Sequence, residues 1–124
     1  MDSRLGLAKR LLLESGRAAF RTQVLEHRLS QLFWECTLRC NLNCRHCGSD
    51  CRKTAGLEDP PMSDLLGVLD SSPAGFDRGN CVVITTGGEP LVRKDIIEVG
   101  AQIKQRGYLW GMVTNGMLLT QDKV

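Results

Sequence analysis

The sequence predicts an α/β fold built on three parallel strands. Apolar runs with strand character stand at residues 31–35, 81–85 and 109–114. Helical patterns separate these runs, and a cluster of glycine, asparagine or cysteine residues follows each of them. Because strands and helices alternate in this way, right-handed crossover connections would bring the three strands into parallel pairing.

Length and charge restrict the class of protein. The chain has 124 residues, enough for one small domain, and a formal net charge of +2, which gives no global basic field for nucleic acid. Residues 1–30 carry six basic and three acidic side chains, whereas the remainder carries ten basic and eleven acidic ones. No apolar run approaches the ~20 residues that a membrane-spanning helix needs.

The first 30 residues are expected to form a basic helical extension ahead of a domain at 31–124. Apolar residues recur at helical spacing over 4–29, and Ser15-Gly16 can split this helix into two pieces. A basic amphipathic helix can dock a partner or a membrane. The favoured interpretation is a helix with a solvated charged face that packs against the domain it precedes.

The N-terminal segment does not resemble a cleaved signal peptide. Charged residues interrupt the apolar run at 11–13, and no small-residue cleavage site follows a long apolar core. The cytoplasm is therefore the expected compartment. There, clustered cysteines are more often reduced metal ligands than disulfides.

The elements of the domain follow in order. The first strand, 31–35, is followed by a cysteine-rich loop and by a polar linker at 52–61. A helix is expected from Ser63 to Leu69, with Ser63 and Asp64 as its N-terminal cap. The strand at 81–85 lacks alternation, which favours burial on both faces.

The second half of the domain is expected to contain one more helix and one more strand. The helix spans Lys94 to Arg106, the strand spans 109–114, and Thr120 could cap a further helix. The core candidates on the helix are Ile96, Ile97 and Ile103, and Gly107 occupies the C-cap position.

The cysteines concentrate between residues 36 and 51, which hold five of the six in the chain. Cys40, Cys44 and Cys47 give the spacing Cys-x3-Cys-x2-Cys. A tetrahedral zinc site usually spreads four ligands over two separated pairs, whereas cysteine thiolates are the normal anchors of an iron–sulfur cube. Three cysteines would hold three irons and leave the fourth open to another ligand.

The distinctive residues all follow predicted strands. The cysteine loop follows the first, the segment 87–90 (Gly-Gly-Glu-Pro) the second, and the segment 114–116 (Thr-Asn-Gly) the third. Ligands of parallel α/β folds bind at this carboxyl edge. Paired glycines let the backbone approach a ligand, and the carboxylate of Glu89 suits an ammonium group.

The two main motifs together resemble the radical S-adenosylmethionine (SAM) superfamily. The Cys-x3-Cys-x2-Cys motif is followed about forty residues later by Gly-Gly-Glu-Pro. The tract 34–48 looks most like the branch with a SPASM-type C-terminal extension, which includes peptide and protein maturases. The resemblance covers residues 31–120 and implies the N-terminal half of a partial (β/α)6 TIM-like barrel, with three of its six β/α units.

The resemblance implies the cofactors and their ligands. Cys40, Cys44 and Cys47 would ligate a [4Fe-4S] cluster, and the SAM amino and carboxylate groups would chelate its fourth iron. Reduction of the cluster would cleave SAM to methionine and a 5′-deoxyadenosyl radical, which abstracts a hydrogen atom from the substrate. The residues implied on the SAM side are Gly87, Gly88, Glu89, Pro90, Thr114 and Asn115.

The other cysteines leave alternatives open. Cys36 and Cys51 flank the motif and are either spare metal ligands or packed in the loop, with packing favoured. Cys81 opens a buried strand and is expected in the core. His46 is expected to pack over the cluster or the adenine rather than to ligate iron.

Two other classes of protein remain open. One is a non-catalytic iron–sulfur electron-transfer module, and the other is a zinc-stabilised interaction module whose basic helix docks a partner. The enzyme interpretation implies three partners: a peptide or protein substrate, an electron donor, and a chain that supplies the missing half-barrel. No nucleic-acid partner is expected.

The later strands of the family's barrel have no counterpart in the sequence. The chain is one piece of a longer or split enzyme, a truncated gene product, or a fragment that another chain completes. Its third strand would leave an open apolar edge. We therefore expect the 124-residue chain alone to bind a cluster poorly and to turn over no specific substrate.

Overall fold

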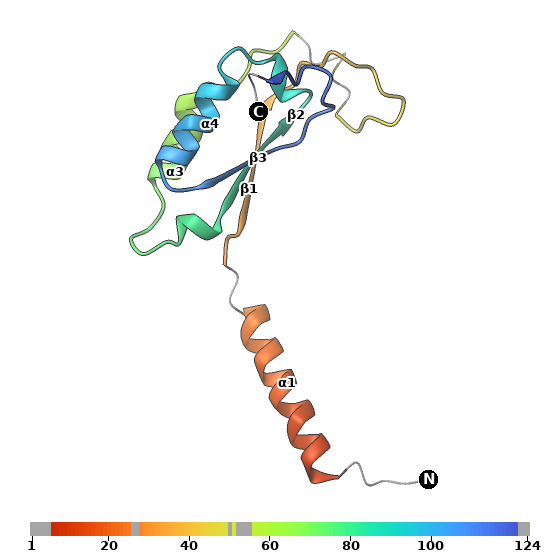
Figure 1. Ribbon diagram of the computed structural model, residues 1–124, viewed down its shortest axis with the longest axis vertical. Helices are drawn as coiled ribbons and strands as arrows, with labels where there is room; N and C mark the ends of the chain where they lie inside the picture. Colours follow the sequence, from red (N-terminus) through yellow and green to blue (C-terminus); the bar gives the residue numbers. More distant parts are fainter. Residues whose placement is uncertain (1–5, 26–27, 50, 52–55, 122–124) are drawn as a thin grey trace.

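The structure is a computed structural model that describes residues 6–25, 28–49, 51 and 56–121. Helices α3 and α4 lie together on one side of the sheet, and α1 extends away from it (Figure 1). The elements are α1 (Leu7–Leu25), β1 (Gln31–Thr37), α3 (Met62–Asp70), the 3₁₀ turn η1 (Arg78–Asn80), β2 (Val82–Gly87), the 3₁₀ turn η2 (Pro90–Val92), α4 (Ile96–Gln105) and β3 (Leu109–Met112).

The three strands form one parallel sheet in the order β1-β2-β3. Phe33 of β1 lies opposite Ile84 of β2, and Ile84 lies opposite Gly111 of β3. The pairing of β1 with β2 continues to Thr37 and Gly87 after a register shift. This arrangement confirms the predicted α/β fold with three parallel strands, consistent with half of a TIM-like barrel.

The core lies between the sheet and the two helices α3 and α4. Its shared feature is full or nearly full burial of apolar side chains, each of which contributes roughly 1.5–3 kcal/mol relative to exposure. The residues are Cys36, Leu65, Leu69, Cys81, Val83, Leu91, Ile96, Val99, Ile103 and Tyr108. The prediction for Cys81 as a core residue is confirmed.

Two burial predictions were wrong. Ile97 is 44% exposed, because it lies about 100° around α4 from the buried Ile96. In β2, Val83 is fully buried, whereas Val82 and Ile84 are only half-buried. The side chains of a strand alternate between two faces, and the helices cover one face of this sheet more fully than the other.

The predicted cap of α3 was also wrong. The helix begins at Met62, with Pro61 at the N-cap position and no side-chain cap. Proline fixes its own φ near the value at a helix start, so the chain can enter the helix one residue earlier than expected. Asp64 lies in the first turn, where its negative charge interacts favourably with the helix dipole.

Helix α1 differs from the prediction in two ways. It runs unbroken past Ser15, whose hydroxyl donates to the carbonyl of Leu12 at 2.9 Å. Its described side chains from Leu7 to Arg21 are all exposed, including Phe20 at 67%. The helix was expected to pack on the domain. Instead, it extends away from the sheet (Figure 1).

Two expected features fall partly outside the described residues: the linker at 52–61 and the helix after Thr120. Within the described ranges, no helix combines the length and the apolar character needed to cross a membrane.

Candidate functional site

The three predicted motifs meet at the carboxyl edge of the sheet. The amide of Gly88 donates to the carbonyl of Thr37 at 2.7 Å, and the amide of Glu89 donates to the carbonyl of Arg39 at 2.9 Å. From the third motif, the Asn115 side-chain amide donates to Oδ1 of Asn41 at 2.9 Å. The segment after β2 and the segment after β3 are therefore both bonded to the beginning of the cysteine loop.

The two glycines of the segment 87–90 are required by this contact. A Cβ on Gly87 would lie 2.0 Å from the carbonyl oxygen of Thr37, and one on Gly88 would lie 2.2 Å from that of Arg39. Gly87 also has a φ of +123°, which L side chains rarely adopt. The sequence assigned these glycines to ligand approach, and the structure adds that they let two loops touch.

Glu89 is completely buried and holds two of the motifs together. Its Oε1 accepts from the amide of Leu91 at 3.0 Å and from the Thr114 hydroxyl at 2.7 Å. Its Oε2 accepts from the amide of Asn115 at 2.7 Å. These three bonds compensate the burial of a carboxylate, and they use three of its roughly four acceptor directions.

The segment 114–116 is a compact turn. The Thr114 hydroxyl accepts from the amide of Gly116 at 3.0 Å, and Oδ1 of Asn115 accepts from the amide of Met117 at 3.0 Å. Gly116 has a φ of +75°. Short polar side chains that bond their own backbone are typical of such turns, and here they fix Asn115 toward the cysteine loop.

The cysteine loop surrounds a cavity of about 250 Å³, lined by Cys40, Cys44, Cys47 and Cys51. Cys44 and Cys47 are exposed, Cys40 is half-buried and Cys51 is buried. All the cysteines are free thiols. Burial raises the pKa of the Cys51 thiol, and the neighbouring Cys47 raises it further.

The thiols line the cavity without converging on one point. Among the described residues, no three side chains of His, Cys, Asp or Glu are arranged to hold a metal ion. The donor set nevertheless fits an iron–sulfur cluster, because several soft thiols from one loop face a common cavity. A cluster would have to draw the thiolates of Cys40, Cys44 and Cys47 together.

The remaining cysteines separate into two kinds. Cys36 and Cys81 are fully buried in the core, and burial raises the pKa of Cys36 to about 11. Cys36 therefore packs, as expected. Cys51 is buried as well, but it lines the cavity of the three motif cysteines, so both alternatives that the sequence left for it, a spare metal ligand or packing in the loop, stay open.

Sequence reasoning also missed the residues that fix the base of the loop. The Thr37 hydroxyl donates to Oδ1 of Asp59 at 2.6 Å, and the Arg39 guanidinium forms an ion pair with the same carboxylate. The hydrogen bond from Arg39 lowers the pKa of Asp59. No motif marks these residues, because the contact joins positions 20 and 22 residues apart.

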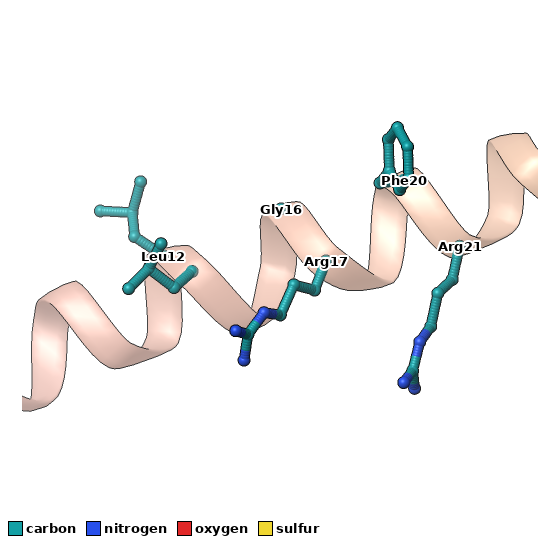
Figure 2. A pocket seen from close by; sticks show the side chains of 6 residues that line it. Leu12, Gly16, Arg17, Phe20 and Arg21 are labelled. Atoms are coloured by element: carbon teal, nitrogen blue, oxygen red, sulfur yellow. The ribbon is translucent and has the colours of Figure 1, made fainter.

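A second hollow lies apart from the motifs, along α1 alone. It measures about 430 Å³, and Figure 2 shows Leu12 and Phe20 on one side of the helix with Gly16 between them. Arg17 and Arg21 project from another side (Figure 2). This hollow contains no thiol or carboxylate, so the strand-end edge is the candidate site.

Comparison with known proteins gives relatives over most of the chain. An AdoMet-dependent heme synthase of Nitratidesulfovibrio vulgaris is 33% identical over 89 residues, which cover 72% of this chain and 23% of the relative. An Fe-coproporphyrin III synthase of Methanosarcina barkeri is 34% identical over 72% of this chain and 22% of the relative. Molybdenum cofactor biosynthesis protein 1 of Bos taurus is 33% identical over 84% of this chain and 17% of the relative.

The chain spans less than a quarter of the length of each of these relatives. No family model matches the sequence, and no solved structure matches it significantly. The heme synthases and the molybdenum cofactor protein are radical SAM proteins, whose family uses a [4Fe-4S] cluster and SAM. The sequence similarity thus supports, for this chain, the radical SAM superfamily that its motifs suggested.

Proposed function

We propose that the chain binds a [4Fe-4S] cluster through Cys40, Cys44 and Cys47, and SAM beside it at the segments 87–90 and 114–116. The observation that carries the proposal is the bonding of both segments to the beginning of the cysteine loop. Three motifs from distant parts of the sequence share one edge, as a site for two adjoining cofactors requires.

The residues of the chain have distinct tasks in this proposal. The backbone of Gly87 and Gly88 lies beside SAM, and Pro90 fixes the turn. Glu89 holds Thr114 and Asn115 in place. Because its side chain is completely buried, its remaining acceptor direction would meet the methionyl amine only after the loops around it open. When bound and reduced, the cluster would supply the electron that cleaves SAM to methionine and a 5′-deoxyadenosyl radical.

The substrate that we propose is a peptide or protein, because the tract 34–48 resembles the SPASM-type branch of maturases. The names of the heme synthase relatives make a porphyrin the competing class of substrate. Because the chain alone is expected to turn over no specific substrate, binding separates the two: the reconstituted chain with SAM is titrated with peptide libraries and with metalloporphyrins. Binding of a peptide supports the first class, and binding of a porphyrin contradicts it. An electron donor is the further partner, in a reducing cytoplasm where free thiols persist.

Metal analysis and SAM cleavage test the cofactor proposal. The full chain is purified without oxygen and reconstituted with iron and sulfide. We expect equal amounts of iron and sulfide, as a [4Fe-4S] cluster requires, at well below one cluster per chain because the chain alone binds a cluster poorly, and a small amount of deoxyadenosine when SAM and dithionite are added together. Bound zinc would favour the interaction module, and a cluster that never cleaves SAM would favour electron transfer.

The amount of deoxyadenosine also tests whether the 124 residues suffice. We expect little product and no dependence on substrate from the chain alone. Robust substrate-dependent formation would show that the half-barrel is catalytically competent by itself.

A further inference from the structure

The side chain of Arg93 lies buried beneath the candidate site and only 5% exposed. Its Nη1 donates to the carbonyl of Cys36 at 2.7 Å and to the carbonyl of Pro60 at 2.8 Å. Its Nε and Nη2 donate to the two carboxylate oxygens of Asp95 at 2.9 and 2.7 Å. The Cζ atom of the guanidinium also lies over the Trp34 ring, 5.0 Å from the centre of the ring.

The two carbonyls that Nη1 binds frame the cysteine loop. Cys36 lies in the last part of β1, before the loop begins, and Pro60 lies just before α3, after the loop has ended. One nitrogen atom therefore holds the two ends of the segment 37–59 together. Arg93 itself follows the segment 87–90 by three residues. The same residue therefore joins the segment 87–90, where SAM is proposed to bind, to both ends of the loop.

Other contacts fix the same place from further directions. Asp59 joins Thr37 and Arg39 across the loop's ends, and the amides of Gly88 and Glu89 bind the carbonyls of Thr37 and Arg39. Thr37 and Glu89 are fully buried, as Arg93 nearly is. Arg93 differs from these contacts because a single side chain bonds the two ends of the segment 37–59.

We propose that Arg93 is a positioning residue of the cofactor site. It fixes the distance between the cysteine loop and the segment 87–90, so that the thiols and the SAM-side backbone face each other. The identity of the cofactors rests on the proposed function. The connection that Arg93 makes between the two ends of the loop rests on its own hydrogen bonds alone.

The chemistry of the position requires arginine. Its planar guanidinium supplies five N–H donors. Here it bonds four acceptor atoms: the two carboxylate oxygens of Asp95 and the carbonyls of Cys36 and Pro60. Lysine keeps the charge but has a single nitrogen, which cannot serve a bidentate carboxylate and two separate carbonyls at once. Arg93→Lys would therefore leave at least one buried carbonyl without its donor.

Arg106, beyond the other end of α4, offers a matched control. It makes the same kind of forked pair, with Asp70 at 2.8 and 3.3 Å, and it also binds Gln102. None of these contacts involves the three motifs. Arg106→Lys thus removes a forked ion pair of the same geometry, with the arginine 22% rather than 5% exposed, without touching the candidate site.

Hydrogen exchange of the full chain without cofactors tests directly whether Arg93 holds the two ends of the loop together. The amides of Gly88 and Glu89 donate across the base of the loop to the carbonyls of Thr37 and Arg39, and the amide of Arg39 donates to the nearby hydroxyl of Thr37. In Arg93→Lys we expect them to exchange at least tenfold faster than in the wild type, and in Arg106→Lys to change less than threefold. Equal effects of the two substitutions would overturn the proposal.

A SAM titration gives the second readout. In reconstituted chain, Arg93→Lys should keep its iron content but need at least tenfold more SAM for the half-maximal change in the electron paramagnetic resonance spectrum. An unchanged midpoint would contradict positioning. If wild-type chain shows no response to SAM, the proposed function fails, and the exchange rates still decide the role of Arg93.

A milder substitution guards against loss of folding in Arg93→Lys. Asp95→Asn removes the charge that orients the guanidinium but leaves the bonds from Nη1 to the two carbonyls possible. We expect about threefold faster exchange of the same three amides, with a cooperative unfolding transition retained. No change at those amides would argue against Arg93 as the support of the loop.

Discussion

The two sides of the candidate site differ in how far the chain alone has built them. On the SAM side, Glu89 is fully buried and accepts three hydrogen bonds. On the cluster side, Cys44 and Cys47 are exposed thiols around an open cavity. The difference teaches that the fold alone fixes one half of the proposed site, and that a bound cluster would have to order the other half.

The cause of the difference lies in what each segment is attached to. The segments 87–90 and 114–116 follow paired strands directly, so the sheet fixes where they start. Within 40–47, Asn41 accepts from the side chain of Asn115, whereas the bonds beside the motif cysteines are long: the amide of Leu42 donates to the Cys40 sulfur at 3.4 Å, and the amide of Cys47 donates to the carbonyl of Cys44 at 3.2 Å. A metal centre can supply the missing order, since metal binding and local folding are coupled.

The largest expected effect comes from the cluster side. Cys44→Ala should abolish cluster binding, because it removes one of the three thiols that would hold the cluster. Iron and sulfide content after anaerobic reconstitution measures the loss. Cys81→Ala, which alters a core cysteine, should retain iron, and iron retained by Cys44→Ala would contradict the assignment.

The next largest effect tests how tightly the SAM side is packed. Gly88→Ala would place a Cβ 2.2 Å from the Arg39 carbonyl oxygen, and should destabilise the chain by about 3 kcal/mol or more, since backbone must move. Urea unfolding measures it. Gly67→Ala, in an open position of α3, should instead stabilise by about 1 kcal/mol. A tolerated Gly88→Ala would mean that the two loops do not touch.

The buried carboxylate gives a smaller effect on the same side. Glu89→Gln turns an amide donor toward groups that already donate, and should destabilise by about 2–3 kcal/mol. Thr114→Val removes one donor to that carboxylate and should destabilise by about 1 kcal/mol. Urea midpoints rank the two, and a neutral Glu89→Gln would show that the carboxylate is not needed for the turn at 114–116.

The smallest effect is on the pH dependence of stability. Arg39 lowers the pKa of Asp59 in the folded chain, below its usual value of about 3.9. The unfolded chain therefore takes up the proton first as pH falls, so the stabilisation is full above about pH 4 and is lost as pH drops through the folded value. Asp59→Asn should reduce the loss of stability between pH 7 and pH 3. An identical loss in wild type and variant would contradict the pairing.

The sequence predicted those features that depend on local pattern. Strand character, helix spacing and turn residues located the parallel sheet and its carboxyl edge, because each is encoded over a few neighbouring residues. Burial of Arg93 and Glu89 was not predictable in this way, since their partners are distant in sequence: Cys36 is 57 residues from Arg93, and Asn115 is 26 from Glu89.

Two predictions failed for different physical reasons. Ser63 looked like a helix cap, but the neighbouring Pro61 sets the entry to α3. The apolar spacing of α1 predicted packing on the domain, and spacing alone does not specify which surface an apolar face contacts. At α3 a second local signal, Pro61, decided where the helix begins, whereas at α1 the tertiary arrangement decided the outcome.

The most direct test of the account is the electron paramagnetic resonance spectrum of the reduced, reconstituted chain, recorded with and without SAM. An iron left open by three cysteines should bind SAM, so the account predicts a spectrum that shifts on SAM addition in the wild type and no cluster signal in Cys44→Ala. A cluster spectrum that SAM leaves unchanged would contradict the account.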